Sequence, residues 1–180
     1  KTLIKEIVLS ATYRQSSIAS KELIEKDPTN KWYARGPRVR LSAEQLRDQA
    51  LAVSGLLSTK MFGNSVMPYQ PQGIWLTPYN GEKWNMSDGE DKYRRAVYTF
   101  WKRSAPYPFM MMFDGAARNV CVARRINTNT PLQALVTLND SSYLDMARNF
   151  AYALKQEGVK DATQQISKGY EQMMYKPISK

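Results

Sequence analysis

The spacing of apolar residues predicts several short helices joined by irregular segments. Residues 3–11 carry apolar side chains at three- and four-residue intervals, which is typical of an amphipathic helix. Residues 18–26 allow at most two further helical turns before Asp27 and Pro28 favour a turn. The segment WYARGPRVR, residues 32–40, predicts an irregular loop that packs by its Trp and Arg side chains, because its Gly-Pro pair disfavours a helix.

The next part of the chain combines a capped helix with a long segment of little periodicity. Ser42 and Gln45 form a capping box, so a helix is expected to start at Ser42 and to end near Ser58. Residues 59–90 are rich in Gly and Pro, but they also contain aromatic rings, which seek buried partners and argue against disorder. We therefore expect a long, aromatic-rich, ordered loop over residues 59–90.

The pattern of residues 91–113 is ambiguous between helix and strand. The β-branched and aromatic residues 97–101 favour a strand, whereas their spacing also fits the apolar face of a helix that runs to about Arg103. The run MMMF at 110–113 is expected to be buried, and so is Cys121, which lies between two valines.

The stretch TNTPLQAL, residues 128–135, predicts the start of another helix. The Thr130 hydroxyl can accept from the backbone N–H of Gln133, and Pro131 takes the first helical position, where its missing N–H is harmless. Leu132, Leu135 and Val136 are then expected to face the core. Two more helices should follow, one capped by Asp140 and ended by Gly158, and one begun at Asp161 and stopped by Pro177.

These patterns predict a mainly α-helical, irregular domain with long ordered loops, and they leave open a short β-pair around residues 97–113. The 180 residues fit a single domain or part of one. The chain starts inside a helical pattern without Met, so we expect a fragment of a larger protein. No apolar run approaches the ~20 residues that a membrane-spanning helix needs.

Composition narrows the chemistry that these residues can perform. The chain has no His and one Cys, which excludes an intrachain disulfide, a CxxCH haem-attachment motif and His-based catalysis within it. We expect neither a metal site nor another cofactor site in the chain. The net charge of +10 suits a polyanionic partner, but the basic residues are dispersed and no nucleic-acid-binding signature is present, so nucleic acid is not favoured.

Several motifs together resemble one known family. They are TYRQSS (12–17), YQPQGIW (69–75), YTFWKR (98–103), TNTPLQAL (128–135) and LND (138–140), together with residues 27–58. This pattern covers nearly the whole chain and resembles domain of unknown function 1553, the C-terminal domain of large secreted proteins of Planctomycetes and related bacteria such as Bacteroidetes.

The resemblance implies an extracytoplasmic protein, in the periplasm or at the cell surface. Family members often carry a cytochrome c domain, so haem c would belong to another part of the parent protein and not to these residues. The implied partners are other domains or chains of that parent. No catalytic residues are established for the family, and none is carried over.

A first hypothesis is a non-catalytic scaffold or docking domain of a secreted, cytochrome c-linked protein. Its arginines would form structural ion pairs with nearby carboxylates, and no nucleophile–base pair is visible. The arginines are Arg94, Arg95, Arg118, Arg124 and Arg125, and the carboxylates include Asp88, Asp91, Asp114 and Asp140.

A second hypothesis is a module that binds or degrades polysaccharide. Trp75 and Trp84 of the aromatic loop would stack on sugar rings, although the same rings could simply anchor the loop to the core. Glycoside hydrolysis needs two carboxylates, and the candidates are Asp88, Asp91 and Asp114.

A third hypothesis is binding of anions or nucleic acid at the helix start near Pro131. Free backbone N–H groups at a helix start attract anions, and Arg124 and Arg125 would add charge-assisted bonds. Asn127 and Asn129 are the candidate polar ligands beside them. The alternative is a capped helix whose arginines are paired internally.

Overall fold

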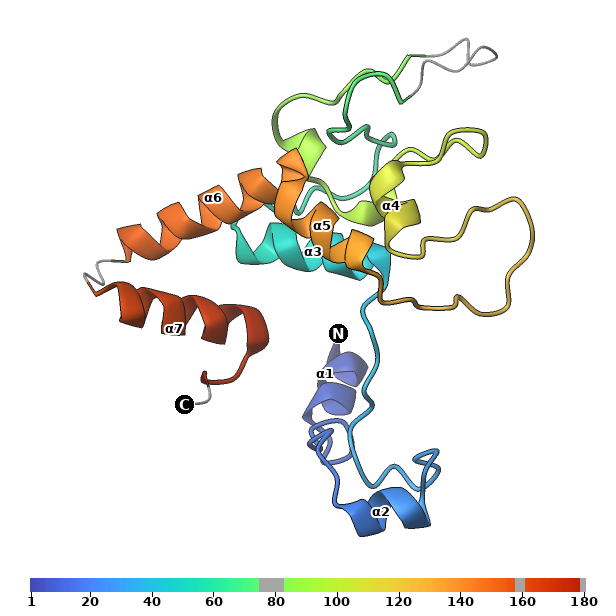
Figure 1. Ribbon diagram of the computed structural model, residues 1–180, viewed down its shortest axis with the longest axis vertical. Helices are drawn as coiled ribbons and strands as arrows, with labels where there is room; N and C mark the ends of the chain where they lie inside the picture. Colours follow the sequence, from blue (N-terminus) through green and yellow to red (C-terminus); the bar gives the residue numbers. More distant parts are fainter. Residues whose placement is uncertain (75–82, 158–160, 179–180) are drawn as a thin grey trace. The chain divides into compact units, whose positions relative to one another are not determined.

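The computed structural model describes residues 1–74, 83–157 and 161–178, and these ranges are mainly helical (Figure 1). They contain isolated β-bridges and no β-sheet. This confirms the prediction of a mainly α-helical, irregular domain with long loops. The chain divides into two compact units, Lys1–Arg40 and Leu41–Lys180. That the whole chain is a single domain, or part of one, stays a prediction.

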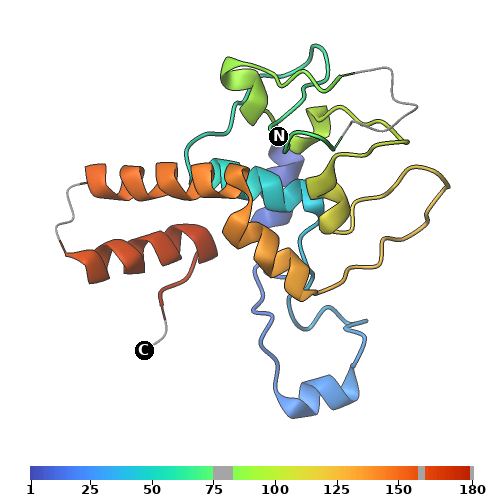
Figure 2. The ribbon, with the colours of Figure 1, turned by 45° about the horizontal axis from the view of Figure 1, so that its top comes forward.

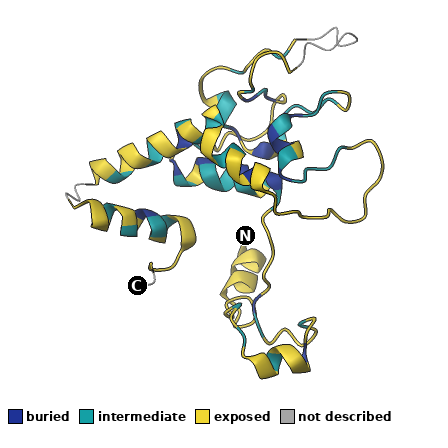
Figure 3. Cartoon of the chain, viewed as in Figure 1, coloured by how far each residue is buried: buried dark blue, intermediate teal, exposed yellow. Residues whose placement is uncertain are grey.

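The first unit holds two short helices, α1 (Thr2–Leu9) and α2 (Lys21–Lys26). Both were expected from the sequence, and Ser20 caps α2 by accepting from the backbone N–H of Leu23. No residue of α1 is buried, so its apolar stripe is exposed along its length (Figure 3).

Asp27 organises the irregular segment that follows α2. Its carboxylate accepts from the backbone N–H groups of Lys31 at 2.8 Å and Trp32 at 2.9 Å. The bond from the Trp32 backbone holds the pKa of Asp27 below its ordinary value. Arg35 donates to the Asp27 carbonyl at 2.7 Å, which confirms packing by an arginine. The expected packing of Trp32 is wrong, because the residue is 70% exposed and it is its backbone N–H that bonds to Asp27.

The second unit begins with α3 (Ala43–Val53), which has the predicted capping box of Ser42 and Gln45. The helix ends at Val53 and not near Ser58. The reason is a turn at Gly55, whose φ of +75° favours glycine, after which two backbone N–H groups fold back onto the Leu51 carbonyl.

Residues 89–113 form neither the β-pair nor the long helix that their pattern allows. Two short 3₁₀ helices, η1 (Gly89–Tyr93) and η2 (Ala96–Tyr98), are followed by α4 (Pro108–Met112). The extended backbone around η2 pairs with an earlier loop instead, through single bridges Ser58–Arg94 and Val66–Thr99. The β-type residues therefore hold the long loop to the core, which a local pattern does not show.

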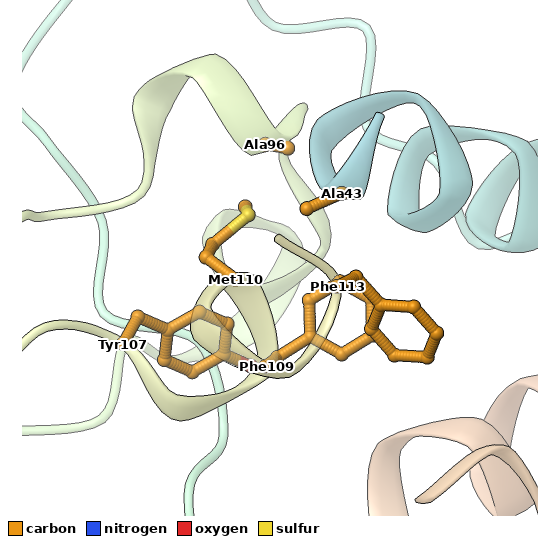
Figure 4. Packing of buried hydrophobic residues seen from close by; sticks show 6 residues of the cluster. All are labelled: Ala43, Ala96, Tyr107, Phe109, Met110 and Phe113. Atoms are coloured by element: carbon orange, nitrogen blue, oxygen red, sulfur yellow. The ribbon is translucent and has the colours of Figure 1, made fainter. Parts of the chain in front are cut away.

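The core of this unit forms where α4 meets α3 and η2 (Figure 4). Aromatic rings dominate it, and the centroids of Phe109 and Phe113 lie 4.9 Å apart. Met110 and Phe113 are buried as expected, whereas Met111 is 38% exposed. The buried cluster consists of Ala43, Ala96, Tyr107, Phe109, Met110 and Phe113.

The chain ends with α5 (Pro131–Asn139), α6 (Ser141–Gln156) and α7 (Ala162–Met174). Asp140 and Asp161 cap the last two, as predicted, whereas the proposed end at Gly158 lies outside the described residues. Figure 2 shows α6 and α7 running antiparallel beside each other, and α6 also packs on α3 and α5.

The prediction that the leucines of α5 face the core is wrong. Leu132, Leu135 and Leu138 are 52%, 55% and 71% exposed, and only Gln133 of this helix is buried. Val136 does pack against the core cluster. Because a short helix that contacts α6 along one side leaves its other side open, most of its apolar stripe faces outward (Figure 3).

Candidate functional site

The segment between α4 and α5 is a loop whose two ends are joined by side-chain hydrogen bonds. Asp114 accepts from the backbone N–H of Thr128 at 2.7 Å and from its hydroxyl at 2.8 Å. Gln133, 2% exposed, donates to the Thr128 hydroxyl at 3.1 Å and to the Met112 carbonyl at 3.0 Å. We call Asp114, Thr128 and Gln133 the loop clamp. It explains the TNTPLQ motif, because Gln133 serves the capping box and the clamp together.

The backbone at the entry to this loop is specialised for the clamp. Asp114 has φ of +60°, a region that Asp and Asn enter more easily than most residues. At Gly115, a Cβ atom would lie 2.5 Å from the Met110 carbonyl oxygen, so a side chain cannot be placed there without a shift of the backbone. The sequence DG at the end of α4 therefore fixes where the loop leaves the core.

Residues 115–127 form an exposed apolar loop, which we call the outer loop. Val120, Val122 and Ile126 are 75%, 55% and 83% exposed. Cys121 is exposed too, which contradicts its expected burial. The cause is that the clamp brings the loop's ends together and leaves the residues between them outside the helical core (Figure 3).

Two arginines hold the outer loop to the rest of its unit. Arg125 makes a two-pronged ion pair with Glu44 of α3, with N–O distances of 2.7 and 2.9 Å. This hydrogen bond lowers the pKa of Glu44 to about 2 and raises that of Arg125. Arg118 lies over the Trp101 ring, 4.8 Å from its centroid.

The arginine pair that precedes η2 is also structural. Arg94 is 2% exposed and donates to the backbone carbonyls of Asn64, Phe62 and Lys60 while its guanidinium covers the Tyr98 ring at 3.8 Å. Arg95 pairs with Asp48 at 3.4 Å. Structural roles for the arginines were expected, but these partners are carbonyls, rings and other carboxylates than those proposed.

The three candidate catalytic carboxylates do not meet in one site. Asp91 pairs with Lys60 at 2.9 Å, and Asp114 belongs to the loop clamp. Asp88 precedes η1 without a side-chain capping bond. None of the three lines either of the two cavities described below. The contacts of Asp91 and Asp114 are those of structural residues.

The remaining candidate binding residues are scattered. Trp84 is half-buried, stacks on Tyr107 with centroids 5.7 Å apart and donates to the Pro68 carbonyl, so it anchors the long loop. Trp75 lies outside the described residues. Arg124, Asn127 and Asn129 are exposed near the end of the outer loop.

The structure reveals a cavity of about 260 Å³, with several polar and charged residues in its lining, that the sequence patterns did not indicate. Arg47 of α3 lines it together with Lys92, Tyr93 and the first turns of α6. Arg47 is 3% exposed and occupies the buried face of α3 between Ala43 and Leu51, four residues from each. That spacing is the signal that could have found it, because a charged residue on a buried helical face needs a partner.

A second cavity, of about 370 Å³, is mainly apolar and lies between α3, α6 and α7. Leu46, Ala50 and Val53, apolar residues at three- and four-residue spacing on α3, line it. Met146, Phe150 and Met173 line it as well. These residues of α3 therefore lie toward α6 and α7, and Leu46 also packs against the aromatic core.

The described ranges contain no helix long and apolar enough to cross a membrane. Within the same ranges, no group of His, Cys, Asp and Glu residues is arranged to hold a metal ion.

Fold and contacts define a mainly helical domain whose sequence motifs serve its own architecture. The model of the family described as protein of unknown function (DUF1553), PSD1, matches residues 1–180, so the chain belongs to this family. No curated protein and no solved structure matches it.

Proposed function

We propose that this chain is a non-catalytic docking domain of a secreted protein. The observation that carries the proposal is the exposed apolar surface of the second unit. Six aliphatic side chains of α5 and the outer loop are more than half exposed: Val120, Val122, Ile126, Leu132, Leu135 and Leu138. Large exposed aliphatic side chains on two consecutive segments of a chain favour a surface that another protein covers.

The contacts that hold the outer loop favour a role in binding and not that of a flexible linker. The loop clamp joins its ends, the Arg125–Glu44 pair ties it to α3, and Arg118 covers Trp101. A loop held at these points loses little conformational entropy on association, so its exposed valines and isoleucine can contribute to affinity. Arg125 and the TNTPLQ motif thus hold a contact surface in place.

The partner in this proposal is another domain or chain of the same protein, outside the cytoplasm. A cytochrome c domain is the candidate that the family resemblance offers. Arg118 and Arg124 at the loop predict an apolar partner surface with acidic residues at its edge, because charge complementarity speeds association and selects partners.

Cys121 provides a natural probe for this proposal, since it is exposed at the centre of the outer loop. Alkylation by a maleimide, followed on the Cys121 peptide by mass spectrometry, should be fast in the isolated chain. In the native-length protein it should be slowed at least about tenfold, because a docked partner excludes the reagent.

Two variants make the experiment decisive. Leu135→Lys with Leu138→Lys should restore fast alkylation of Cys121 in the native-length protein without lowering the melting temperature of the isolated chain. Lys155→Cys, at the exposed far end of α6, supplies a matched thiol that should react at the same rate in both proteins. Equal rates for Cys121 in the two proteins would refute docking on this surface.

A further inference from the structure

The cavity beside Arg47 contains a buried cation without a matching anion. The Arg47 guanidinium donates to the Lys92 carbonyl at 2.9 Å, and its Nε has no hydrogen-bond partner in the part of the chain that the structure describes. No ion pair joins Arg47 to a carboxylate of these ranges within 4.0 Å. Because an unpaired buried charge is unfavourable, this site favours an anionic group as the missing partner.

The lining of the cavity also contains groups that bind hydroxyls. Asp145 uses one carboxylate oxygen to accept from the Tyr93 hydroxyl at 2.8 Å, and its other oxygen has a long contact of 3.4 Å from Asn149. Ser141 and Ser142 line the same cavity at the start of α6. A ligand with several hydroxyl groups can satisfy both the acceptor on Asp145 and the serines.

The charge, apolar lining and volume of the cavity narrow the class of ligand that fits it. A phosphate or sulfate would bring two negative charges close to Asp145, whereas a carboxylate brings one and matches the planar guanidinium. Tyr69, Met86 and Met146 add apolar surface for a carbon skeleton. The volume, about 260 Å³, lies just below the range of ~300–1,000 Å³ typical of small-molecule sites, so the ligand is small.

We propose that the Arg47 cavity binds a polyhydroxy carboxylate of the size of one sugar acid. Its carboxylate pairs with Arg47, with Lys92 adding positive charge at the wall, and its hydroxyls bond to Asp145 and the serines of α6. The site is separate from the outer loop, so this proposal does not depend on docking.

Isothermal titration calorimetry on the 180-residue chain tests the proposal with three probes. D-glucuronate should bind with a millimolar or lower Kd. D-glucose, which has the same ring without the carboxylate, should bind at least about tenfold more weakly, because it lacks the charge-assisted bonds to Arg47. Sulfate should also bind at least about tenfold more weakly than D-glucuronate, since it lacks the hydroxyls.

Matched variants locate the binding. Ser141→Tyr narrows the cavity from an exposed helix position and should weaken D-glucuronate at least about tenfold, whereas Leu144→Tyr, exposed on the same helix away from the cavity, should leave the Kd unchanged. Arg47→Lys should lower the affinity for D-glucuronate by a similar factor if this variant folds. If it does not fold, Ser141→Tyr alone decides whether the ligand binds in this cavity. Absent binding of D-glucuronate, equal affinity for D-glucose or sulfate, or an unaffected Ser141→Tyr variant would overturn the proposal.

Discussion

Two regions of the unit Leu41–Lys180 depart in opposite directions from the usual distribution of residues. Around η1 and η2, Arg47 and Arg94 are 3% and 2% exposed. On α5 and the outer loop, leucines and valines stand more than half exposed. Arginine is seldom buried and large aliphatic residues usually are, so each region needs its own physical explanation.

The explanations differ in where the partner lies. Arg94 has its partners within the chain, namely the backbone carbonyls of Lys60, Phe62 and Asn64. These carbonyls lie in a loop, where no helix or strand supplies a hydrogen-bond donor. The leucines Leu132, Leu135 and Leu138 of α5 are not covered in this way, since each is more than half exposed. Arg94 therefore completes the fold, whereas the exposed leucines indicate an interaction beyond it.

The largest expected effect comes from the buried region. Arg94→Met should lower the free energy of unfolding by about 3 kcal/mol, because the loop loses the hydrogen bonds that Arg94 donates to its carbonyls and the guanidinium no longer covers the Tyr98 ring. Urea denaturation measures it. Arg124→Met, on the exposed loop, is the matched control and should change stability by less than about 0.5 kcal/mol. Similar losses of unfolding free energy in both variants would contradict the structural role assigned to Arg94.

The loop clamp should give an intermediate effect. Asp114→Ala removes both acceptors for Thr128 and places Ala at φ of +60°, so we expect about 2 kcal/mol of destabilisation and faster hydrogen exchange of the Thr128 amide. Asp114→Asn keeps one acceptor oxygen, and Asn adopts a positive φ more easily than Ala. This variant should therefore retain most of the stability that the Ala variant loses. An unchanged exchange rate in the Ala variant would show that the clamp does not order the outer loop.

The smallest effect concerns the half-exposed pair of Glu44 and Arg125. The ordinary pKa of Glu44 is 4.5 and its folded value is about 2, so its stabilisation is present above pH 4.5 and is lost as the pH falls through 2. Glu44→Gln should therefore cost about 1 kcal/mol near neutral pH, and the difference from the parent chain should vanish near pH 2.

Chemical denaturation between pH 2 and 7 measures this difference. Arg125→Gln should remove the same pH-dependent contribution, and the double variant should show no further loss. A difference that persists at pH 2 would mean that the pair acts by packing and not by charge.

The elements that sequence reasoning predicted are those decided by near neighbours. Ser42 and Gln45, or Thr130 and Gln133, are three residues apart, so their capping boxes can be recognised in the sequence and are found in the structure. Asp161 likewise caps α7 through N–H groups two and three residues away. Local hydrogen bonding alone was enough for most helix starts.

The errors concern contacts between distant residues. Glu44 and Arg125 are 81 residues apart, and Arg94 reaches a carbonyl 34 residues away, so no window of sequence contains both partners. The prediction that Leu132 and Leu135 face the core was wrong for another reason. Their spacing shows that one helical face is apolar, but it does not show whether the chain itself covers that face.

The loop clamp also affects how this fold can diversify. Since Asp114 and Thr128 join the ends of the outer loop, the helices before and after it depend little on how many residues lie between. Lengthening a flexible loop costs only about 0.6 kcal/mol for each doubling, so extra residues inserted near Cys121 should leave α4 and α5 intact. Relatives can therefore change the length and chemistry of this segment independently of the core. The same position is suited to carrying a grafted peptide.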